Sequence, residues 1–124
     1  MNPIGFMLPD TERAYLRELA AKQAEIAALP VMDARKQMWY DLNDGRSGAR
    51  PPVVIKTWTF DRDFMPEEVF RCTSDGGRRI ERQLLRHIRN HELIGDVKVV
   101  PDTFDIGWSV DIDEFGVAID RKTI

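Results

Sequence analysis

The sequence predicts an α/β protein in which an N-terminal helical hairpin is followed by a β-α-β unit and a β-hairpin. Helix-period apolar stripes fill residues 10–45, two short apolar runs flank a long amphipathic helix, and a strictly alternating stretch follows the second run. The 124 residues are enough for one modest core. We therefore expect a single domain over 1–124, with the hairpin in residues 1–45 and the rest in 50–124.

Two helix patterns occupy the first part of the chain. Leu16, Leu19 and Ile26 fall on one face of the first helix at helical spacing. Pro30 separates this helix from a second, which ends near Gly45. The stripe of the second helix consists of Val31, Ala34, Met38, Trp39 and Leu42. Because short helices gain most of their stability from packing, each stripe is expected to bury against the other or against a larger surface.

Two apolar runs and the helix between them predict the β-α-β unit. Residues 53–58, VVIKTW, are mostly apolar without clean alternation, which is typical of a strand covered on both faces, and residues 97–100, VKVV, form the second such run. Ser74 or Asp75 caps the intervening helix, which extends to about His91. Its buried stripe consists of Ile80, Leu84, Leu85 and Ile88. The expected connection is a right-handed crossover between parallel strands.

Beyond the second run, polar and apolar residues alternate. The apolar face of this stretch consists of Phe104, Ile106, Trp108, Val110 and Ile112. Period two over this length predicts a half-exposed strand, with residues 114–116 turning into a return strand that contains Val117 and Ile119. Two parallel strands and a hairpin leave uncovered edges. We therefore expect a longer chain, or a homo-oligomer with Phe104, Trp108 or Val110 at the contact.

Composition excludes several classes of protein. The formal net charge of -3 argues against broad binding to nucleic acid or anionic membranes. Cys72 is the single cysteine, so no internal disulfide can form, which is typical of a reducing compartment. No apolar run approaches the ~20 residues of a transmembrane helix. The sequence predicts a soluble, cytoplasmic protein.

Two charged residues interrupt the apolar stripes. Arg35 lies on the stripe of the second helix, and Glu81 lies between Leu85 and Ile88 on the long helix. Buried charges require partners because their desolvation is otherwise too costly. We expect each to form an ion pair between elements, in preference to a catalytic role.

The long helix carries two further patterns. His87 and His91 stand four residues apart but lack a third ligand in sequence, so we expect no metal site. A second face consists of Arg78, Arg82, Arg86 and Arg89. A solvated surface is the expected state of this face, with an acidic partner or phosphate as the alternative ligand.

The first candidate catalytic residues follow the second predicted strand. Asp102 and Asp105 come directly after residues 97–100. In α/β folds, catalytic groups collect at the carboxyl ends of parallel strands. Both aspartates are therefore candidates, and the pattern does not choose between them.

Four stretches of the sequence resemble a known family. They read WYDLNDG (39–45), RPPVVI (50–55), IERQLLR (80–86) and DVKVVPD (96–102). Together they resemble the N-terminal part of the uroporphyrinogen decarboxylase-like superfamily, which includes the cobamide-dependent methyltransferases. The resemblance implies the first, incomplete part of a (β/α)₈ barrel that is preceded by a helical extension, and a parent protein longer than this segment.

The resemblance also implies roles for individual residues. The decarboxylase has an arginine-rich substrate-binding turn after its first strand, where this chain has Lys56 and Trp58 and lacks the Arg-Gln-Ala-Gly-Arg pattern. This departure favours the methyltransferase branch, with Lys56 and Trp58 as substrate-binding candidates. Asp102 or Asp105 matches the essential aspartate after the second strand.

Cofactors and partners follow from the same resemblance. The family implies zinc and a corrinoid protein partner for the full-length protein, with no cofactor held by this segment and no catalysis by the segment alone. The alternative is a small, self-standing interaction module that dimerises and has no enzymatic activity.

Overall fold

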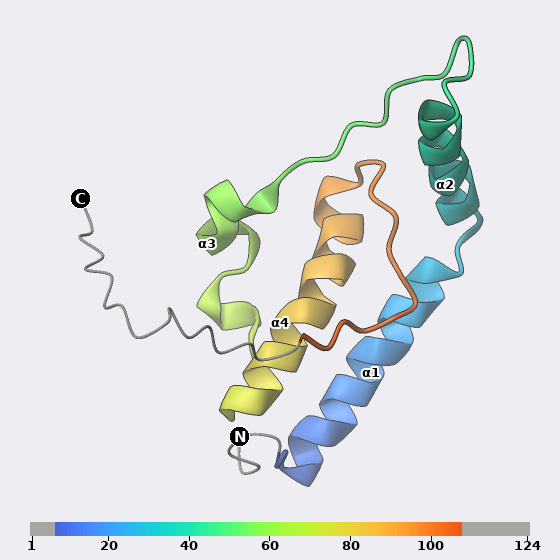
Figure 1. Cartoon of the computed structure of the whole chain (residues 1–124). Coiled ribbons are helices and arrows are strands. Elements are labelled where there is room, and N and C mark those ends of the chain that lie inside the picture. Colours follow the sequence, from blue (N-terminus) through green and yellow to red (C-terminus); the bar gives the residue numbers. More distant parts are fainter. Residues whose placement is uncertain (1–6, 108–124) are drawn as a thin grey trace, which may run out of the picture.

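The computed structural model describes residues 7–107, and all the regular secondary structure in them is helical. Three long helices are present: α1 (Asp10–Ala27), α2 (Pro30–Asn43) and α4 (Asp75–Arg89), the last continuing as the π-helix η4 (Asn90–Ile94). Between α2 and α4 lie η2 (Thr57–Phe60), α3 (Asp61–Phe64) and η3 (Glu67–Val69) (Figure 1). None of the helices in this part of the chain is long and apolar enough to cross a membrane.

The predicted α/β class is wrong. Residues 7–107 contain no β-strand, so the β-α-β unit and the first part of a barrel are absent from them. Residues 53–56 and 97–100 are extended, and a single backbone hydrogen bond joins them, from Val97 N to Val53 O at 3.5 Å. A strand requires a ladder of such bonds to a neighbour, which an apolar run cannot supply alone.

The predicted β-hairpin is also absent from the part of it that the structure describes. Residues 104–107 form no strand, and the rest of the predicted hairpin, including Trp108, Val110 and Ile112, lies outside the described residues.

The predicted helices are confirmed because their signals are local. The Ser74 hydroxyl accepts a hydrogen bond from Gly77 N at 3.1 Å, which makes Ser74 the N-cap of α4. Gly45 follows α2 with φ +63°, a left-handed conformation that favours glycine. Propensity and capping act within a few residues, so the sequence can predict them without knowledge of tertiary contacts.

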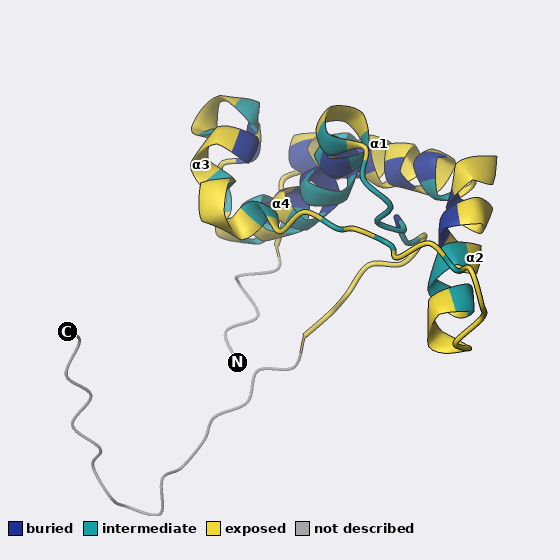
Figure 2. Cartoon of the chain, turned by 90° about the horizontal axis from the view of Figure 1, so that it is seen from above, coloured by how far each residue is buried: buried dark blue, intermediate teal, exposed yellow. Residues whose placement is uncertain are grey.

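α4 is the central element of the fold (Figure 1). α1 runs parallel to it: Glu12 contacts residues just before α4, and Lys22 pairs with Glu92 beyond its end. Figure 2 shows the buried residues gathered between the two helices. The core includes Leu16, Leu19, Ile26, Leu84, Leu85 and Ile88, together with Phe64, Met65, Phe70 and Val100.

The expected hairpin of α1 with α2 is replaced by the contact of α1 with α4. α2 leads away from this pair (Figure 2) and buries Met32 and Arg35, while Val31 and Leu42 of its predicted stripe are exposed. The reason is its partner: Arg35 Nη1 donates to Lys98 O at 3.0 Å. The extended segment after η4 therefore selects the face that α2 buries.

The beginning of α4 yields a prediction about Gly77. A Cβ atom at this position would clash with Glu12 Oε2 and lie 2.7 Å from Ser74 Oγ. We expect Gly77→Ala to lower the free energy of unfolding by roughly 1–2 kcal/mol, since the clash outweighs the gain in helix propensity. Urea denaturation measures this. Gly107→Ala, which has no atom within 4 Å of the new Cβ, is the control. Equal stability of both variants would contradict the packing of Glu12 described above.

Candidate functional site

Glu81 is fully buried, with 0% of the residue exposed. Its Oε1 accepts hydrogen bonds from Tyr15 O–H at 2.9 Å and Arg71 N–H at 2.7 Å, and its Oε2 accepts one from Cys72 N–H at 3.0 Å. The expected burial of Glu81 is confirmed, but hydrogen-bond donors take the place of the expected ion pair. A satisfied buried carboxylate of this kind joins α1, α4 and the preceding turn.

A second carboxylate holds the same turn. Glu12 Oε1 accepts hydrogen bonds from Thr73 N at 2.7 Å and Ser74 N at 3.2 Å, and its Oε2 contacts the Ser74 hydroxyl. The Ser74 side-chain hydrogen bond and the Thr73 backbone bond lower the pKa of Glu12 to about 2. A carboxylate of the chain itself therefore occupies the amides that directly precede α4, and the Ser74 hydroxyl accepts from the Gly77 amide in its first turn.

The thiol of Cys72 and the hydroxyl of Tyr15, which lie near these carboxylates, are held in their protonated forms. Desolvation by burial, followed by the Glu81 charge, raises the pKa of the Cys72 thiol to about 12. Burial and the hydrogen bond to Glu81 raise the pKa of Tyr15 to about 12. Because the thiolate is the reactive form of cysteine, Cys72 is suited to packing and not to nucleophilic catalysis.

Side chains from two helices, α1 and α2, bind the backbone of residues 97–103. Trp39 Nε1 donates to Val97 O at 3.4 Å, and Gln23 Nε2 donates to Pro101 O at 2.7 Å and Thr103 O at 3.2 Å. Arg35 donates to Lys98 O from α2 and is 9% exposed, so its expected burial is confirmed while a carbonyl group replaces the expected ion-pair partner. These contacts hold the segment through its main chain, in addition to the burial of Val100 in the core.

The predicted catalytic and substrate-binding residues lie on different surfaces. Asp102 and Asp105 are exposed on the segment after η4, and Asp105 lines a hollow beside the first half of α4. Lys56 and Trp58 are exposed before α3, where Trp58 borders a depression formed with residues 59–63. No described pocket contains residues of both groups. Their proposed roles stay predictions, because residues outside 7–107 are not included in these surfaces.

The arginine face of α4 forms ion pairs with residues of the preceding segment. Arg78 pairs with Glu67 at 2.7 Å, and Arg86 pairs with Asp61 at 2.9 Å. The hydrogen bond to Glu67 raises the pKa of Arg78. Arg78 and Arg82 also lie over the Phe70 ring, with guanidinium carbons 5.0 and 4.7 Å from its centre. This ring anchors their planar groups to the surface of the molecule.

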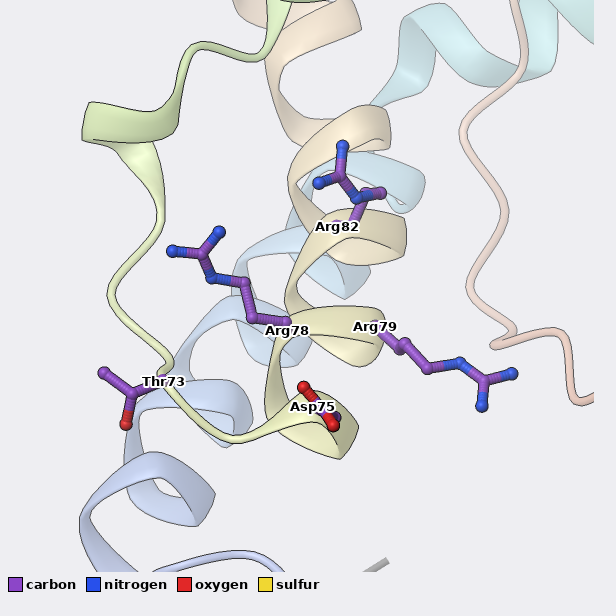
Figure 3. A pocket seen from close by; sticks show the side chains of 5 residues that line it. All are labelled: Thr73, Asp75, Arg78, Arg79 and Arg82. Carbon is purple, nitrogen blue, oxygen red and sulfur yellow. The ribbon is translucent and has the colours of Figure 1, made fainter. Parts of the chain in front are cut away.

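Figure 3 shows an open hollow at the start of α4. It is lined by Thr73, Asp75, Arg78, Arg79 and Arg82. Arg79 extends away from Arg78 and Arg82, so the three guanidinium groups do not converge on one point. A phosphate-binding cluster requires convergent donors. The geometry therefore favours the predicted solvated face over the alternative phosphate site.

His87 of α4 and His91 of η4 are both half-buried. Nδ1 of His87 and Nδ1 of His91 are both buried without a hydrogen-bond partner in the described residues. Burial, together with the Lys98 charge, lowers the pKa of His87, so its neutral form is favoured. Within residues 7–107 no group of three or more potential metal ligands is present, and the expected absence of a metal stays a prediction.

Exposed apolar side chains follow the extended segments. Val53, Ile55 and Trp58 are 67%, 47% and 71% exposed, and Phe104 and Ile106 are exposed on the second segment. Residues 53–58 do not form the predicted doubly covered strand, so the exposure of Val53, Ile55 and Trp58 was not expected. Gln23 lies on the predicted apolar face of the first helix and is buried there. The burial of Glu12 was not predicted, although it occurs at the helical spacing of Leu16 and Leu19, a signal that its polarity hid.

Comparison of the chain with protein-family models, curated proteins and solved structures found no match. Support for a function therefore comes from the contacts described above and from the four stretches that carry the sequence resemblance.

Removal of the Tyr15 hydroxyl tests the Glu81 network. We expect Tyr15→Phe to lower the free energy of unfolding by about 1.5–2 kcal/mol, because a buried carboxylate loses one donor. The measurement is urea denaturation at pH 7. Tyr40→Phe is the matched control, since Tyr40 is 58% exposed, and it should change stability by less than about 0.5 kcal/mol. Indistinguishable Tyr15→Phe and Tyr40→Phe variants would show that Glu81 does not need this donor.

The pKa of Glu12 predicts a dependence of stability on pH. Because its folded-state pKa is lowered from 4.5 to about 2, its stabilising effect is present above pH 4.5 and is lost as pH falls toward 2. We expect Glu12→Gln to be less stable than the wild type at pH 6 and this difference to shrink below pH 4. Urea titrations at several pH values measure it, with exposed Glu18→Gln as the control. A difference that stays constant from pH 6 to pH 2.5 would refute the assignment.

Proposed function

We propose that this segment is the non-catalytic N-terminal docking part of a uroporphyrinogen decarboxylase-like protein of the methyltransferase type, which acts in the cytoplasm. Two exposed apolar patches, one along residues 53–58 and one along residues 104–106, bind the catalytic part of the same protein. The observation that carries this proposal is that side chains of α4 hydrogen-bond to both segments, Arg86 to Thr57 and Gln83 to Asp105, while the apolar side chains of the segments remain exposed.

The first support is how firmly the segments are held. Asp96 Oδ2 accepts a hydrogen bond from Ile55 N at 2.8 Å, and Val53 O accepts one from Val97 N at 3.5 Å. Trp39 of α2 bonds to Val97 O. A preformed surface loses less conformational entropy on binding than a flexible one. The surface is therefore better suited to docking than a free linker of the same composition.

The second support is the chemistry of the exposed side chains. Trp58 is 71% exposed and Ile106 is 84% exposed. Exposed apolar side chains of this size are typical of interaction sites, and tryptophan is enriched among residues that dominate binding energy. The charged residues next to this surface, Lys56 and Asp105, suit the polar rim of an interface.

The third support links the resemblance to the contacts. Three of the four stretches that carry it, 39–45, 50–55 and 96–102, are bonded to one another through Trp39, Val53 and Ile55. Residues that serve one docking surface are expected to be close in space, and these three stretches are joined by hydrogen bonds. In this proposal Asp102 or Asp105, together with Lys56 and Trp58, contributes to catalysis only after the catalytic part supplies zinc and binds the corrinoid protein.

The alternative is a dimerising module without enzymatic activity. The same exposed side chains, with Phe104 at the contact, would then be covered by a second copy. The oligomeric state distinguishes the two, because a surface that docks on a catalytic part need not associate with itself.

Methyl transfer tests the proposal. The complete reading frame that contains these residues is assayed with methylcobalamin as donor, a thiol as acceptor and added zinc, beside residues 1–124 alone. We expect turnover by the complete protein and none by the 124 residues. Trp58→Ser should reduce turnover of the complete protein by weakening docking, while Tyr40→Ser should not. Turnover by the 124 residues alone, or none by the complete protein, contradicts the proposal.

Sedimentation velocity of residues 1–124 decides the alternative. Under the docking proposal we expect a monomer at a protein concentration of about 100 μM, because any self-association would be too weak to form a stable dimer. A dimer that Trp58→Ser or Phe104→Ala dissociates would establish the interaction module instead.

A further inference from the structure

A hollow of about 290 Å³ lies between the first half of α4 and residues 104–107. Ile80 of α4 and Phe104 and Ile106 of the segment give it apolar walls, and Arg79 and Asp105 contribute one charge of each sign. Its size is just below the range of typical small-molecule sites, which are concave and mostly apolar with a few polar groups. It therefore has room for a fragment-sized ligand.

The outer wall of the hollow is held in place by Gln83. With its amide oriented to suit its neighbours, the Gln83 side-chain nitrogen donates to Asp105 O at 3.1 Å and its oxygen accepts from Asp105 N at 2.7 Å. This pair of bonds fixes the backbone between Phe104 and Ile106. The two apolar side chains are thus positioned opposite Ile80 before any ligand binds.

Arg79 differs from the other arginines in the first half of α4. Arg78 pairs with Glu67 and Arg82 with Asp61, whereas Arg79 is exposed and forms no ion pair within residues 7–107. Figure 3 shows its side chain extending away from Arg78 and Arg82. Its guanidinium group is consequently available to a ligand in the hollow.

We propose that this hollow binds a small organic monocarboxylate with an aromatic or branched aliphatic body. The carboxylate would bind the fork of Arg79 donors, and the body would pack against Ile80, Phe104 and Ile106. The Asp105 carboxylate lines the same space and repels a second negative charge, so dicarboxylates and phosphate are disfavoured. Phe104 and Ile106 also belong to the proposed docking surface, so the ligand and a docked partner would compete for these two side chains.

The test is a titration of the ¹⁵N-labelled chain with 3-phenylpropionate, followed by amide chemical shifts. We expect saturable shifts at Ile80, Gln83 and Ile106. Arg79→Gln should weaken binding about tenfold, since a charge-assisted pair is lost. Neutral 3-phenylpropanol should bind the wild type as weakly as 3-phenylpropionate binds Arg79→Gln. The control Arg17→Gln removes an exposed arginine of α1 and should leave the affinity unchanged.

Several outcomes would overturn the inference. They are an absence of saturable shifts, equal affinity of the wild type and Arg79→Gln, or equal affinity for acetate and 3-phenylpropionate. Phe104→Ala tests whether the apolar body of the ligand contributes to affinity. It should weaken the binding of 3-phenylpropionate and leave the affinity for acetate unchanged. Amide spectra of each variant report whether the fold is retained, so a loss of binding can be separated from unfolding.

Discussion

Two carboxylates hold the turn that begins α4, the helix against which α1 packs to form the core. Glu81 binds the amides of residues 71 and 72, and Glu12 binds those of residues 73 and 74. Four consecutive backbone donors thus have anionic acceptors, one carboxylate from each of the paired helices. A buried carboxylate is stable only when it is hydrogen-bonded, so the turn and the two helices stabilise one another.

The sequence predicted what is local and missed what depends on distant partners. The helix over 75–89 and its Ser74 cap followed from patterns within a few residues. The burial of Glu81 followed from its place on the apolar stripe. Its partners could not be predicted, because two of them are backbone amides, which every residue type except proline carries. The supposed strands failed for the same reason: residues 53–56 are apolar, yet extended neighbours decide whether a strand forms.

The candidate site was only partly predictable. Asp102 and Asp105 were chosen because they would follow a strand in a parallel sheet, and without that sheet nothing in residues 7–107 brings them near Lys56 and Trp58. The hollow beside α4 was not predicted. It depends on Gln83, whose side chain pairs with the backbone of Asp105 22 positions further along the chain, a relation that helical periodicity cannot indicate.

The way in which the extended segments are held explains why they can bind something else. Trp39, Arg35, Gln23 and Gln83 form hydrogen bonds with main-chain groups of residues 97–105. Such bonds leave the side chains of Phe104 and Ile106 free for other contacts, while Val100 of the same segment is buried in the core. Here Phe104 and Ile106 are positioned and still exposed, which is the combination that a preformed binding surface requires.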